Sequence, residues 1–96
     1  MKPIVGIAWF KEEDYLFLRD IFQDGHALPA TYAEWLQKAK GLFDNLSQRG
    51  FNPVKVYIDP DTFLQWCREN GRSLDAKART AYVNFILAKK FQSNHQ

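Results

Sequence analysis

An uninterrupted apolar run near the N-terminus, residues 4–10, constrains the fold more than any other segment of the chain. Its sequence, IVGIAWF, offers no polar side chain to water and is rich in β-branched and aromatic residues. Such a run predicts a strand that is buried on both faces. It is far shorter than the ~20 residues that a membrane-spanning helix needs. Other elements of the chain must therefore cover this strand.

A second strand and four helices follow in the pattern of apolar and polar residues. Residues 54–58 alternate as a half-buried strand does. Helices are expected from about 12 to 23, from 32 to 49, from 60 to 70 and from about 75 to 91. The order β-α-α-β-α-α predicts an α+β fold (α/β two-layer), with a small sheet covered by helices. We expect one domain over residues 1–96, with 92–96 as a frayed tail.

Two helix starts carry clear capping signals. Thr31 and Glu34 have the spacing of a capping box, and the apolar residues that follow form a narrow stripe on one helix face. Asp59 followed by Pro60 predicts a second start, with aspartate as the cap and proline at the first helical position.

Aromatic residues make up 16% of the chain, a heavy load for 96 residues, and many of them fall in the first 22 positions. Two strands alone make a weak sheet, and the first expected helix is apolar around most of its circumference. We therefore expect a homodimer, in which the sheet is completed by antiparallel pairing of the first strands. A helix sandwiched within one monomer is the alternative. The expected dimer interface comprises Ile7, Trp9, Phe10, Phe17, Ile21 and Phe22.

An arginine in the last expected helix stands out, because Arg79 falls on the main apolar face. A charge there must be paired or must line a polar cavity. One interpretation is an ion pair with Asp75, four residues earlier. The other is a ligand pocket in which Arg79 holds an anion between the rings of Trp9, Trp35 and Tyr82.

The sequence offers no recognisable catalytic, cofactor or metal site. Cys67 lies on an apolar helix face, and the two histidines, His26 and His95, fall in a loop and in the tail. Their spacing matches no zinc motif, and no glycine-rich phosphate loop is present. We expect no catalytic residue, no metal and no cofactor. A single cysteine favours a reducing compartment, and we expect a cytoplasmic protein that uses no membrane.

Nucleic-acid binding is the alternative function, because positive charge is uneven along the chain. Residues 49–96 carry eight Lys/Arg and four Asp/Glu, a net charge of +4. The helices expected over 61–91 resemble a helix-turn-helix in outline. The turn is long, however, and Lys77 and Thr80 stand where that motif needs apolar residues. A solvated basic face explains the charge more simply.

Four segments together resemble a group of small, uncharacterised bacterial proteins of about this length. They are GIAWF at 6–10, TYAEWL at 31–36, WCRENGR at 66–72 and DxxARxxY at 75–82. The resemblance implies a bacterial, self-standing protein and brings no activity with it. We expect a non-enzymatic, self-associating module that binds a protein or a small ligand through an aromatic- and arginine-lined surface.

Overall fold

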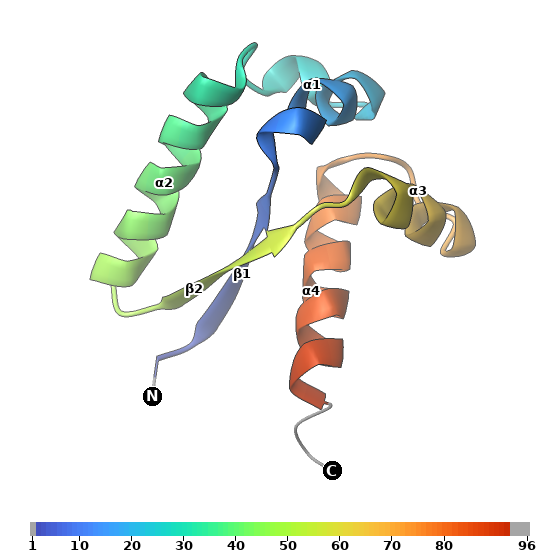
Figure 1. Ribbon diagram of the computed structural model, residues 1–96. Helices are drawn as coiled ribbons and strands as arrows, with labels where there is room; N and C mark the ends of the chain where they lie inside the picture. Colours follow the sequence, from blue (N-terminus) through green and yellow to red (C-terminus); the bar gives the residue numbers. More distant parts are fainter. Residues whose placement is uncertain (1, 93–96) are drawn as a thin grey trace.

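Two parallel strands lie at the centre of the computed structural model, which describes residues 2–92 (Figure 1). Strand β1 (Ile4–Trp9) pairs in register with β2 (Asn52–Tyr57), so that Trp9 lies opposite Tyr57. Helix α1 (Glu12–Ile21), the 3₁₀ helix η1 (Gly25–Ala27) and helix α2 (Tyr32–Gln48) connect the strands. Helices α3 (Pro60–Glu69) and α4 (Ala76–Gln92) follow β2. The expected α+β fold and element order are confirmed, and η1 is an addition.

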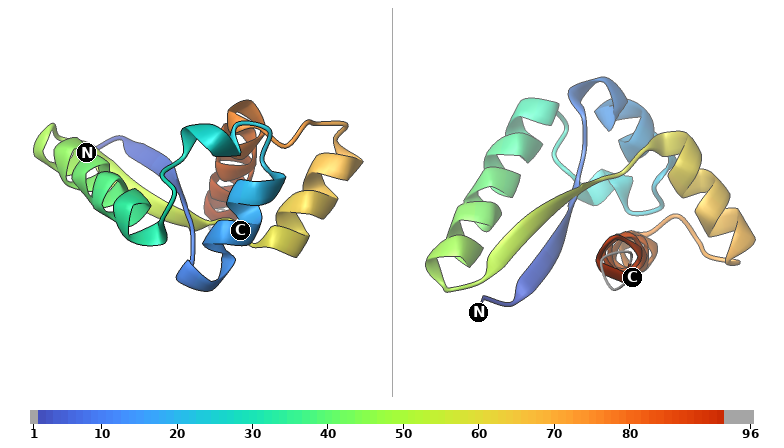
Figure 2. Two further views of the ribbon diagram at one scale, coloured as in Figure 1. Left: turned by 90° about the horizontal axis from the view of Figure 1, so that it is seen from above. Right: turned by 60° about the horizontal axis from the view of Figure 1, so that its bottom comes forward.

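The two long helices cover opposite faces of the sheet, as the views in Figures 1 and 2 show. On one face, the Trp9 ring lies 5.2 Å from that of Trp35 in α2. On the other face, α4 packs closely on Gly6, and a Cβ there would lie 2.5 Å from side-chain atoms of Val83 and Leu87. Strand β1 is therefore covered on both faces, as its apolar sequence predicts.

The expected helix caps are formed. The Thr31 hydroxyl accepts a hydrogen bond from Glu34 N at 3.2 Å. The Asp59 carboxylate accepts one from Thr62 N at 3.0 Å, with Pro60 at the start of α3. These bonds satisfy backbone donors that have no partner within the helix. Hydrogen bonding from Thr62 holds the pKa of Asp59 below its ordinary value.

Helix α1 ends at Ile21, about two residues earlier than the sequence predicts. The chain turns there because Gln23 N donates to the carbonyl oxygen of Leu74, just before α4, at 2.7 Å. Gly25 then lies so close to the backbone carbonyl of Arg19 that any side chain would clash. The segment after α1 is therefore held against the rest of the molecule.

The core takes up most of the aromatic residues that we expected at a dimer interface. Ile7, Trp9, Phe10 and Phe22 are buried within the single chain. Phe22 lies against Phe10 and Phe63, with ring centroids 5.9 and 6.0 Å apart. Helices of the same chain cover most of their surface, and Ile7 and Phe10 also line a surface groove toward α2. Of the expected interface residues, Phe17 is exposed and Ile21 is half-buried.

Among residues 2–92, no helix is long and apolar enough to cross a membrane. Helix α4 includes Gln92, the first residue of the expected tail. Residues 93–96, the rest of that tail, lie outside the described residues.

Candidate functional site: the free edge of strand β1

The outer edge of β1 presents backbone groups that the described part of the sheet leaves without a strand partner. Asn52 N donates to Pro3 O at 2.8 Å, and Ile58 N donates to Trp9 O at 2.9 Å. Because backbone groups alternate in direction along a strand, odd-numbered residues of β1 face β2. The N–H and C=O groups of Ile4, Gly6 and Ala8 therefore point away from β2, and the described sheet has no third strand beside them.

The outer edge of β2 is built differently. By the same alternation, Pro53, Lys55 and Tyr57 turn their backbone groups outward there. Proline has no N–H to offer, which is a common device against strand pairing. The Lys55 ammonium lies over the Trp9 ring, 4.5 Å from its centre, so Pro53 is the residue that protects this edge. The outward residues of β1 are Ile, Gly and Ala, and none of them is a proline.

Two grooves flank the outer edge of β1, one toward each covering helix. The groove toward α4 has a volume of about 170 Å³ and is lined by Gly6, Ala8 and one side of α4. The groove toward α2 has a volume of about 380 Å³ and includes Leu28, Trp35 and Leu42. Ala8 and Arg79 line both grooves. A segment beside β1 would therefore meet side chains on both of its faces.

Arg79 is held at the end of this edge by an ion pair with Asp24. Its guanidinium donates two hydrogen bonds to the Asp24 carboxylate, at 2.8 and 2.7 Å, and lies 4.4 Å from the centre of the Phe22 ring. The hydrogen bonds from Arg79 hold the pKa of Asp24 below its ordinary value. This pair ties the segment after α1 to α4.

The expected partner Asp75 has a different role from the one that we considered. Its carboxylate accepts a hydrogen bond from Ala78 N at 2.9 Å and so caps α4. Among the described residues, Arg79 forms its ion pair with Asp24 and not with Asp75. Asp24, 55 residues away in sequence, takes its place.

The expected aromatic walls are not brought together around Arg79. Trp35 lines the groove toward α2 with Arg79. Trp9 lies under α2, and Tyr82 packs between Phe63 and Trp66 on the other side of the fold. Burial raises the pKa of Tyr82. Of the three rings, Trp35 is the one that lines a groove together with Arg79.

Nucleophilic and metal-binding groups give no site among residues 2–92. Cys67 is buried, and burial raises the pKa of its thiol, which disfavours the reactive thiolate. His26 lies exposed in η1, whereas His95 is outside the described residues. No cluster of three or more metal-ligating side chains occurs within the described part of the chain.

Two of the eight basic side chains in residues 49–96 are Arg49, at the end of α2, and Lys55, on β2, and the other six are spread over α3, α4 and the turn between them. Arg72 lies over the Trp66 ring at 5.6 Å, and Lys89 lies over the Phe85 ring at 5.7 Å. These contacts place two of the cations on aromatic surfaces of the same chain. Nucleic-acid binding by this half of the chain stays a prediction.

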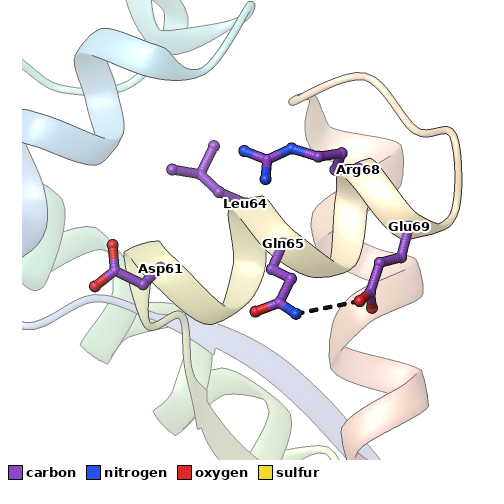
Figure 3. Close-up of a pocket in the computed structure, with 5 residues that line it drawn as sticks. All are labelled: Asp61, Leu64, Gln65, Arg68 and Glu69. Carbon is purple, nitrogen blue, oxygen red and sulfur yellow. Dashed lines mark hydrogen bonds between the residues drawn. The ribbon is translucent and has the colours of Figure 1, made fainter.

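A depression on α3, drawn in Figure 3, is lined by Asp61, Leu64, Gln65, Arg68 and Glu69. All five residues come from one helix, and Gln65 donates to Glu69 at 3.1 Å. Because no second element contributes a side chain, the depression is the ordinary surface of a helix.

Comparison with protein-family models, with curated proteins and with solved structures found no match to this chain. The resemblance to small bacterial proteins stays a prediction. The candidate site therefore depends on the geometry of this chain alone.

One part of this site, the partner of Arg79, was not predicted from the sequence. Asp24 carries no local signal, since its partner lies in another helix. The expected pairing of the first strands already required an open edge on β1. The sequence signal that distinguishes the two edges is Pro53, because no proline occurs within residues 4–10.

Proposed function

We propose that this chain is a non-enzymatic interaction module that binds a protein partner along the free edge of β1. The observation that carries the proposal is the difference between the two edges of the sheet. The outward backbone groups of Ile4, Gly6 and Ala8 are available, whereas Pro53 removes an outward N–H from the edge of β2. An extended segment of a partner can bond to β1 as a third strand.

Burial makes this edge favourable for binding. Gly6 and Ala8 are half-buried between α2 and α4, so water reaches their backbone groups less freely than at an open surface. Backbone donors and acceptors in such surroundings gain from a protein partner. The flanking grooves also supply apolar contacts for the partner's side chains.

Selection of peptides from a random display library tests this proposal. The test variant is Ala8→Pro, which removes one outward N–H of β1 and places a ring carbon at the edge. The control is Tyr57→Pro, which removes an outward N–H from the edge of β2. We expect the natural chain and the control to retain peptides that Ala8→Pro does not.

Circular dichroism first confirms that both variants are folded. The proposal is wrong if no peptide is enriched on the natural chain, or if Ala8→Pro retains the same peptides as the control.

A homodimer is a second proposal, favoured by a separate surface on α1. Leu16 and Phe17 are adjacent there and are 65% and 52% exposed, and neighbouring exposed apolar side chains favour association. Light scattering at micromolar concentration should give twice the mass of the chain, and Phe17→Ser should lower it toward the monomer. A monomeric mass for the natural chain would refute the dimer.

We place the module in the cytoplasm, as the single cysteine predicts.

A further inference from the structure

Extending the proposed function, on which this inference rests, we infer that the partner of β1 is an extended peptide segment with alternating small and bulky apolar side chains, flanked by acidic residues. The segment would lie between α4 and α2, with its backbone bonded to Ile4, Gly6 and Ala8. The two grooves, the charges around them and the position of α4 each contribute to this assignment.

The unequal sizes of the grooves predict the alternation. Side chains of an added strand point in turn to either face of the sheet. The groove toward α4 is the smaller, about 170 Å³, and α4 lies against Gly6 there, so this face accepts small residues. The groove toward α2 is about 380 Å³ and includes the half-exposed Leu42, so this face accepts bulky apolar residues.

The charges around the grooves predict acidic flanks. No Asp or Glu lines either groove, whereas Lys38 lines the groove toward α2. Lys77 lies beside Ala76 and Thr80 on the exposed surface of α4. Arg79 contributes little net charge, because Asp24 neutralises it. The two lysines therefore favour a segment with negative charge next to its apolar part.

The position of α4 favours an isolated segment over β1 of a second folded copy. Paired strands lie about 4.8 Å apart, whereas packed helices need about 8–10 Å between their axes. Because α4 packs directly on Gly6, antiparallel pairing of two β1 strands about Gly6 would bring the two α4 helices too close together. A segment without its own helix avoids this clash.

Two synthetic peptides test the inference: ESLAVALSE and its charge-reversed control KSLAVALSK. Binding is measured by calorimetry at low ionic strength, and amide hydrogen exchange is followed by NMR. We expect the acidic peptide to bind about fivefold more tightly, because rim charges contribute modestly. Its binding should slow exchange of the Gly6 and Ala8 amides about tenfold or more, and Ala8→Pro should abolish it.

Charge-reversal variants locate the electrostatic contribution. Lys38→Glu should remove the preference for the acidic peptide, whereas Lys40→Glu should keep it, because Lys40 is exposed on α2 outside the groove. Equal or tighter binding of the basic peptide, with Gly6 and Ala8 still protected, would overturn the acidic partner and leave the proposed function standing. Failure of both peptides to protect these amides would overturn the inference, whereas the library selection decides the proposed function separately.

Discussion

Replacing Asp24 by asparagine should destabilise the fold more than its partly exposed position suggests. The side chain of Asp24 is 32% exposed, whereas that of Arg79 is 11% exposed. The substitution removes the charge that receives two hydrogen bonds at 2.8 and 2.7 Å. It leaves a mostly buried guanidinium without its counter-ion, although the Phe22 ring remains beside it.

The expected loss lies between the values for exposed and for buried ion pairs. Exposed pairs contribute about 0–1 kcal/mol, and removing one partner of a buried pair costs about 3–5 kcal/mol. We therefore expect Asp24→Asn to lower the free energy of unfolding by about 2 kcal/mol at neutral pH. For a chain of this length, that corresponds to a fall in Tm of roughly 10 °C.

The pH dependence gives a second test with a definite sign. Because the pKa of Asp24 is lowered in the folded protein, its contribution is fully present above the ordinary aspartate value of about 3.9. It is lost as the pH falls through the folded pKa. The difference in unfolding free energy between the natural chain and Asp24→Asn should therefore shrink as the pH falls from neutral to below about 3.

Urea denaturation at neutral and acidic pH measures both effects. Asp20→Asn is the matched control, because Asp20 is an exposed carboxylate on α1 and the same charge is removed. A double-mutant cycle with Arg79→Met should give a coupling energy above about 1 kcal/mol. The reasoning is refuted if Asp24→Asn costs no more than the control, or if its cost does not fall in acid.

Three further predictions concern the core. Gly6→Ala should lower the unfolding free energy by about 1–3 kcal/mol, because its Cβ would meet Val83 at 2.5 Å; adding Val83→Ala should recover part of the folding defect seen in thermal melts. Phe63→Ala should cost about 3–5 kcal/mol in urea denaturation, since that ring is fully buried. The Cys67 thiol should react with a disulfide reagent at the rate of local or global opening, because it is buried with a raised pKa. Fast labelling under native conditions would contradict this.

The helix starts could be predicted because their signals are local. Thr31 bonds to the backbone of Glu34, and Asp59 to that of Thr62, each within three residues. The apolar run at residues 4–10 and the alternation of apolar and polar residues at 54–58 likewise indicated the two strands. The parallel pairing of the strands and the early end of α1 depend on contacts between distant segments, so the pattern of neighbouring residues contained no signal for them.

The aromatic residues show why we expected a second copy of the chain to cover side chains that this chain covers itself. We inferred that the N-terminal strand and helix needed cover from outside the chain. The rings of Trp9 and Phe10 lie 5.2 and 4.8 Å from Trp35, and Phe22 lies against Phe63. Composition predicts how much apolar surface must be covered. It does not predict whether the same chain supplies the cover.

The two edges of the sheet connect this burial to function. A two-stranded sheet is at best marginally stable alone and gains stability by packing against helices, and α2 and α4 cover the two faces of β1. The same helices narrow the space beside its free edge to two grooves. Since Pro53 disfavours pairing at the edge of β2, the strand that we propose as partner is directed to β1. The packing that stabilises this small domain would thereby also limit where, and in what extended form, the proposed partner binds.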